Sequence, residues 1–89
     1  MNTNDLLNIA HTFGSPVYVY DAEKIGSQYH RLVNAFSAVP KLRINYAMKA
    51  LSNISVLKLM KDLGTGLDTV SIQEVQLGLL AGFAPAQII

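Results

Sequence analysis

The chain has 89 residues, a formal net charge of +1 and no cysteine. This composition excludes a disulfide framework, a thiolate metal site and the strongly basic surface of a nucleic-acid or membrane-surface binder. Hydrophobic residues make up 51% and charged residues only 15%, against about 25% charged in an average globular domain, so we expect other parts of a larger protein to cover much of the surface.

No segment predicts a membrane span, a signal peptide or a metal site. The longest apolar-rich run, Leu77 to Ala84, is far shorter than the ~20 residues of a membrane span, and Met1 to Asp5 lacks the basic start of a signal peptide. The two histidines lie at unrelated positions. We therefore expect a cytoplasmic protein without bound metal and without membrane or nucleic-acid partners.

The first half of the chain predicts two helices separated by a strand. Asn4 and Asp5 favour the cap of a short helix that ends near Gly14. Residues 17–20 are β-branched or aromatic throughout and predict a strand, whose partner is not evident. Asp21 then predicts the N-cap of a second helix, which should end before Pro40. Its apolar face repeats at helical spacing in Ile25, Tyr29, Leu32, Val33 and Phe36.

Residues 42–47 predict a second strand that leads into a lysine. Alternation along the strand puts Lys49 on the same side as Asn45 and Ala47. A lysine beside a buried strand costs free energy unless it is solvated, paired or used chemically. Its amine can form a Schiff base with an aldehyde, and the small Ala47 leaves room for a flat ring.

The second half of the chain alternates helices and strands. Ser52 or Asn53 can cap a helix that ends at Gly64, and its face of Ile54, Leu57, Met60 and Leu63 is expected to be core, as is Met48. A strand over 66–70 follows. Ser71 and Glu74 have capping-box spacing for a helix that ends at Gly82, and residues 88–89 predict the start of a third strand.

This alternation predicts an α/β fold with a parallel sheet and helical crossovers. An open doubly wound sheet and a closed eight-stranded barrel both fit the pattern. Lys49 and Asp68 fall at or near the carboxyl ends of their strands, where barrel enzymes place their chemistry, and this favours the barrel. A charge on the inner face of a strand needs a partner, so we expect Asp68 to pair with Lys49.

Two spaced motifs resemble the fold-type III pyridoxal-phosphate decarboxylases. The first is Tyr46-Ala47-Met48-Lys49-Ala50, and the second runs from Gly64 to Glu74 with the pattern Gly-x-Gly-x-Asp-x-x-Ser-x-x-Glu. Residues 13–21 and 81–83 add matches, so the resemblance covers about residues 11 to 89. The sequence departs from the family at Leu51, where many members have asparagine, and at Ile72-Gln73, where many have two glycines.

The resemblance implies a site that this chain begins and does not complete. Lys49 would hold pyridoxal 5'-phosphate as a Schiff base, with Ala47 and Asp68 beside it. The family's phosphate and ring-nitrogen ligands come from later segments, and its members form homodimers. The implied reaction is the decarboxylation of a small amino acid. The favoured substrate is meso-2,6-diaminopimelate, and the alternatives are ornithine, arginine and carboxynorspermidine.

The resemblance also implies a division of the chain. Residues 1–20 would be a helix and a strand associated with a separate β-domain, and residues 21–89 would be the first helix and first βα units of a (β/α)8 TIM-like barrel. A hypothesis of another class is a catalytically inactive fragment or association module, since open sheet edges attract further strands.

Overall fold

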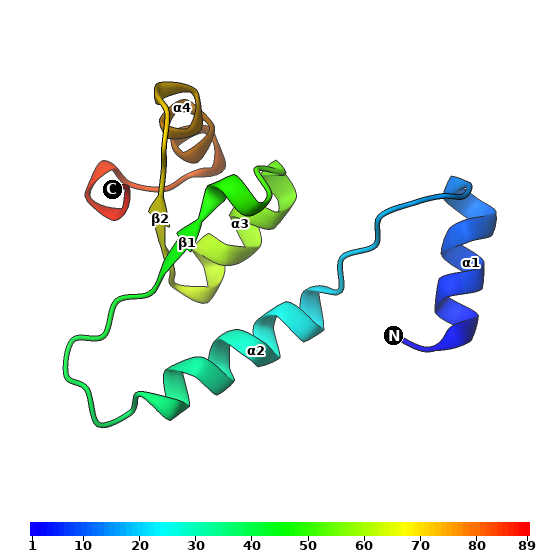
Figure 1. Ribbon diagram of the computed structural model, residues 1–89, viewed down its shortest axis with the longest axis horizontal. Coiled ribbons are helices and arrows are strands. Elements are labelled where there is room, and N and C mark those ends of the chain that lie inside the picture. The colour runs from blue at the N-terminus through cyan, green and yellow to red at the C-terminus, as the bar shows by residue number, and fades with distance from the viewer.

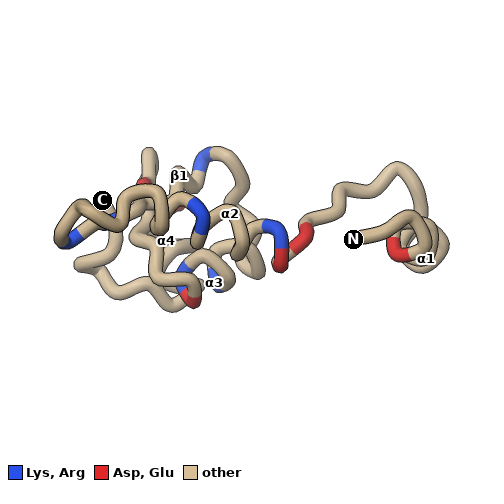
Figure 2. Tube along the Cα trace, turned by 90° about the horizontal axis from the view of Figure 1, so that it is seen from below, with Lys and Arg blue, Asp and Glu red and all other residues tan.

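The computed structural model describes all 89 residues. Its elements are α1 (Thr3–Phe13), α2 (Ala22–Ala35), β1 (Asn45–Ala47), α3 (Ile54–Leu63), β2 (Gly66–Asp68) and α4 (Ile72–Ala81), with 3₁₀ turns at Met48–Ala50 and Pro85–Gln87. Helices α3 and α4 lie against each other beside the two strands, while α1 lies apart and is joined to α2 by an extended segment (Figure 1). Figure 2 shows α1 apart from the rest in a second view, and charged residues scattered along the chain.

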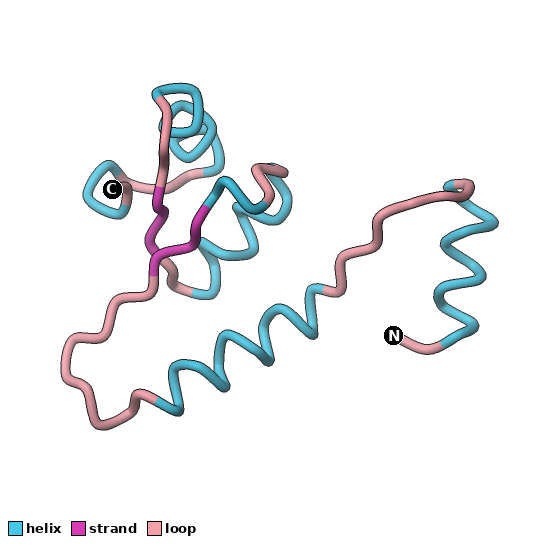
Figure 3. The backbone as a smooth tube through the Cα atoms, viewed as in Figure 1, coloured by secondary structure: helices cyan, strands magenta, loops and turns pink.

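Parallel pairing of β1 with β2 forms the sheet (Figure 3). The register joins Asn45 to Gly66, Tyr46 to Leu67 and Ala47 to Asp68. Ile88 forms a parallel bridge to Leu67 on the other side of β2, and the amide of Ile89 donates to the Leu67 carbonyl over 2.9 Å. The predicted third strand therefore begins where the sequence indicates, and the α/β organisation with parallel pairing is confirmed.

Local signals place most helix ends. Asp21 caps α2 by accepting from the Lys24 amide, and this hydrogen bond lowers the pKa of Asp21. Of the two candidates for α3, Asn53 is the cap, because its side chain accepts from the amides of Ser55 and Val56. Gly64 and Gly82 end α3 and α4 with φ of 105° and 103°, a left-handed conformation that costs glycine little.

Two cap predictions need correction. Helix α1 begins two or three residues earlier than expected, because Asn2 and Asp5 form a reciprocal capping box. At α4 the Ser71 hydroxyl accepts from the Glu74 amide as predicted, over 3.2 Å, but the Glu74 carboxylate accepts from the amide of Val70 over 2.8 Å instead of from Ser71. Glu74 therefore ties the cap to the loop after β2.

The predicted strand over 17–20 is wrong for this structure. The segment is exposed and makes no backbone hydrogen bonds, because no strand of the chain lies beside it. The other two strands are shorter than predicted. Ladder pairing begins at Asn45 and ends at Asp68. Before it, the Ile44 carbonyl still accepts from the Gly66 amide over 2.8 Å, and after it Val70 already turns toward α4.

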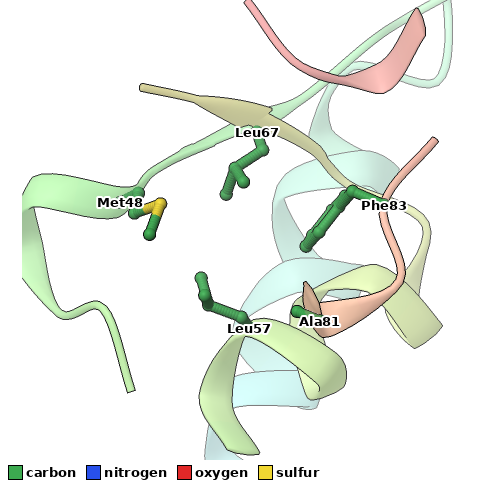
Figure 4. Close-up of a cluster of buried hydrophobic side chains, with 5 residues drawn as sticks. All are labelled: Met48, Leu57, Leu67, Ala81 and Phe83. Atoms are coloured by element: carbon green, nitrogen blue, oxygen red, sulfur yellow. The ribbon is translucent and has the colours of Figure 1, made fainter. Parts of the chain in front are cut away.

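The core lies between the sheet and helices α3 and α4. Its five buried hydrophobic side chains converge on a common space in Figure 4 and are Met48, Leu57, Leu67, Ala81 and Phe83. Met48 and Leu57 are core residues as predicted, whereas Met60 is only half-buried. Buried Thr65 satisfies its hydroxyl by donating to the Met60 carbonyl over 3.1 Å.

Much apolar surface remains uncovered. The accessible area is 6431 Å², against about 5,100 Å² for a compact protein of 9.7 kDa. The radius of gyration is 15.2 Å, against about 12 Å for a compact domain of this length. Exposed apolar side chains include Tyr18, Leu80 and Val70. None of the helices combines the length and the apolar character of a membrane-spanning helix.

The packing of α4 on β2 predicts opposite effects for two glycine-to-alanine changes. A Cβ at Gly78 would overlap Leu67, which is fully buried, whereas a Cβ at Gly26 in α2 has only Leu63 nearby, at 3.8 Å. We expect Gly78→Ala to lower the free energy of unfolding by about 1–3 kcal/mol through overpacking. The matched control Gly26→Ala should raise it by about 0.5–1 kcal/mol through helix propensity. Urea denaturation measures both changes, and stabilisation by Gly78→Ala would contradict the packing described here.

Candidate active site

The predicted site residues lie at one edge of the sheet. Ala47 and Asp68 are the last residues of β1 and β2, and the register places them opposite each other. Lys49 follows within the 3₁₀ turn Met48–Ala50. Because the strands are parallel, both carboxyl ends meet at this edge, and a ligand bound there would contact both strands.

Lys49 is exposed, and its amine makes neither a hydrogen bond nor an ion pair within the protein. The strand ends at Ala47, so the alternation of side chains along it does not extend to Lys49. The prediction that Lys49 lies on the same side of the strand as Asn45 and Ala47 therefore does not hold. The neighbouring Met48 is fully buried. The backbone before the lysine is therefore anchored, and the amine is free to react.

Asp68 is half-buried and its carboxylate has no hydrogen-bond or ion-pair partner. The ion pair predicted between Asp68 and Lys49 does not form. The pair is absent because the lysine is exposed, and a solvated amine gains little free energy from pairing with a carboxylate. The half-buried carboxylate is left available to a polar ligand at the edge.

Ala47 borders a cavity of about 530 Å³ between α2, β1 and α3. The lining is mostly apolar, with the aromatic rings of Tyr20, Tyr29 and Tyr46 in its wall. Neither Lys49 nor Asp68 lines it. This cavity is therefore separate from the exposed lysine, and of the three predicted site residues only Ala47 lines it.

Sequence reasoning missed the role of Tyr46. Its hydroxyl donates to the carbonyl of Leu51 over 2.8 Å, across the turn that carries Lys49. Burial raises the pKa of Tyr46, and the nearby Tyr20 adds to the rise. The phenol is therefore a neutral donor at physiological pH. The only sequence signal was a tyrosine close before the lysine.

Gly66 allows two polar side chains to approach β2. The Nε atom of Arg43 donates to Oδ1 of Asn45 over 2.9 Å, and a Cβ at Gly66 would overlap that oxygen. Leu67, between Gly66 and Asp68, points instead into the core. Alternation along β2 therefore separates an apolar face that packs on the helices from a polar face that carries Asp68.

This arrangement suits carbonyl chemistry. An exposed primary amine can attack an aldehyde, and a neighbouring carboxylate can orient the amine or accept a proton. The described residues contain no group of three histidine, aspartate or glutamate side chains arranged to hold a metal ion.

Comparison with known proteins gives a family match over most of the chain. Residues 22–89 match the family model described as "Pyridoxal-dependent decarboxylase, pyridoxal binding domain". The match includes Lys49, Ala47 and Asp68, and begins at the first residue of α2.

Individual relatives share one name. The chain is 37% identical over 86 residues to diaminopimelate decarboxylase of Methanothermobacter thermautotrophicus, covering 96% of this chain and 20% of the relative. It is 44% identical over 78 residues to that of Helicobacter pylori strain J99, covering 88% and 19%. It is 39% identical over 85 residues to that of Escherichia coli K12, covering 96% of this chain and 19% of the relative. The chain thus spans about one fifth of the length of these relatives.

Proposed function

Because the chain belongs to the pyridoxal-dependent decarboxylases, we propose that it forms the amino-terminal part of a diaminopimelate decarboxylase. The reaction is the removal of carbon dioxide from meso-2,6-diaminopimelate to give L-lysine. The observation that carries this proposal is the position of Lys49 and Asp68 at one carboxyl edge, within a sequence 36–44% identical to proteins named diaminopimelate decarboxylase.

The site fits pyridoxal phosphate. Lys49 offers a primary amine without an internal partner, and Asp68 offers a half-buried carboxylate that no protein group satisfies. Ala47, opposite Asp68 in the register, has a side chain too small to block a flat ring between them. A ligand with an aldehyde and a polar ring would use all three residues.

When bound, pyridoxal phosphate supplies the electron sink that stabilises the carbanion left by loss of carbon dioxide. Lys49 would hold the cofactor through Nζ and release it when the substrate amine arrives. Nζ of Lys49 would also be placed to hold or move a proton beside the reacting carbon. Asp68 would offer its half-buried carboxylate to a polar group of the bound cofactor at the same edge.

The free edges of the small sheet support the proposal that this chain is one part of a larger barrel. Residues 21–89 would form the first units of a (β/α)8 barrel, with further strands on the free edges of β1 and of Ile88–Ile89. Residues 1–20 would associate with a separate β-domain, where the exposed 17–20 segment would gain a partner strand. Residues outside this chain would bind the phosphate and the ring nitrogen, and a homodimer in the cytoplasm would complete the enzyme.

Other amino acids are alternative substrates. Enzymes of the same fold type that act on ornithine, arginine or carboxynorspermidine would use the same lysine and the same sheet edge. The names of the relatives favour diaminopimelate. A function of another class is association alone, in which these 89 residues bind a complementary chain without catalysis. The uncovered apolar surface supports that reading, but it gives no role to the free amine of Lys49.

Reductive labelling tests the cofactor site. We expect pyridoxal phosphate followed by borohydride to label the full-length protein at Lys49, because this amine lies at the carboxyl edge of the sheet. Peptide mapping by mass spectrometry identifies the labelled residue. Lys49→Ala should abolish labelling, whereas the matched control Lys58→Ala, at an exposed position in α3, should leave it unchanged. Labelling spread evenly over the exposed lysines would reject the assignment.

Release of carbon dioxide from competing substrates tests the reaction. We expect the full-length protein with pyridoxal phosphate to prefer meso-diaminopimelate to ornithine, arginine and carboxynorspermidine by about 10²-fold or more in kcat/KM, since a site built for a polar substrate group discriminates strongly against analogues that lack it. The 89-residue chain alone should release none, because it lacks the proposed phosphate ligands. A preference for one of the other amino acids would show that meso-diaminopimelate is not the substrate. Activity of the isolated chain would contradict the proposal that residues outside it bind the phosphate.

A further inference from the structure

The backbone around Lys49 is held by two hydrogen bonds, each of which joins a residue before the lysine to Leu51 after it. Ladder pairing ends at Ala47, so the following turn has no neighbouring strand. Within the turn, the Leu51 amide donates to the Met48 carbonyl over 3.2 Å. Across it, the Tyr46 hydroxyl donates to the Leu51 carbonyl over 2.8 Å. The side chain of one strand residue therefore closes the loop that presents the lysine.

The part of this loop that precedes the lysine is anchored in the core. Met48, directly before the lysine, is fully buried. Tyr46 packs against the core cluster, and its burial keeps the phenol in the protonated form that can donate. Lys49 follows both anchors and has an exposed side chain. The core thus fixes the lysine backbone while the amine stays accessible.

The position of that backbone decides where the amine can react. A lysine stem is flexible, but its root and direction are set by the residue's Cα. A misplacement of about 1 Å at a reacting group can cost about 10²-fold in rate. Since no strand partner holds the turn, the hydrogen bond from Tyr46 is the contact best placed to prevent such a shift.

We propose that Tyr46 is a positioning residue for Lys49, acting through its hydrogen bond to the Leu51 carbonyl. This inference rests on the proposed role of Lys49 in binding pyridoxal phosphate. It assigns the tyrosine a function beyond core packing: the ring fills the space beside the core, and the hydroxyl sets the geometry of the lysine turn. The ring and the hydroxyl can therefore be separated experimentally.

Tyr46→Phe in the full-length protein removes the hydroxyl and retains the ring. Tyr29→Phe is the matched control, because Tyr29 lines the same cavity and its hydroxyl makes no hydrogen bond. Two readouts apply. The first is amide hydrogen exchange of Leu51 in the cofactor-free protein, and the second is the rate at which Lys49 reacts covalently with pyridoxal phosphate, followed by absorbance.

We expect Tyr46→Phe to speed Leu51 exchange about fivefold, as the net loss of one hydrogen bond allows, and to slow the reaction of Lys49 by a similar factor or more. Exchange in α4 should keep its wild-type rate, and Tyr29→Phe should change neither readout. A wild-type reaction rate in Tyr46→Phe would overturn the proposal, and so would equal slowing by both variants or faster exchange throughout the protein. Failure of the wild-type protein to react at Lys49 would instead reject the proposed cofactor site.

Discussion

Parallel pairing of β1 with β2 is the constraint on which the rest of this structure depends. Because Ala47 lies opposite Asp68, both strands end at the same edge, and whatever follows β1 is presented beside the end of β2. The pairing is stabilised from one side, where Leu67 packs with Met48 and Leu57 under the helices. The other face of β2 carries Gly66 and Asp68, and is left for polar groups.

This division of faces explains how a small, open unit can present an exposed lysine beside a buried core. Burial of Met48 anchors the turn, and the exposed neighbour Lys49 keeps a free amine. The same unit leaves apolar residues uncovered on α4 and along 17–20, which agrees with a chain that spans about one fifth of its relatives' length. The turn that exposes the amine of Lys49 is held by contacts within this chain. The groups proposed to surround the rest of a cofactor would come from outside it.

Local signals in the sequence predicted much of the fold. Asp21, Gly64 and Gly82 define helix ends through hydrogen bonds or backbone conformations of their own neighbourhood, and they were predicted correctly. The 17–20 strand was not, because a strand needs a partner that no local pattern reveals. The bond from Tyr46 to Leu51 was also missed, since it depends on a 3₁₀ turn that interrupts the strand pattern. Placement of Lys49 and Asp68 at one edge followed from the parallel topology, but their ion pair did not form.

The most direct test of the central claim is a crystal structure of the full-length protein with pyridoxal phosphate. The account predicts continuous density from Nζ of Lys49 to the cofactor, with the Asp68 carboxylate contacting the cofactor ring at the carboxyl edge of β1 and β2. Cofactor joined to another lysine, or bound at the opposite edge of the sheet, would contradict it.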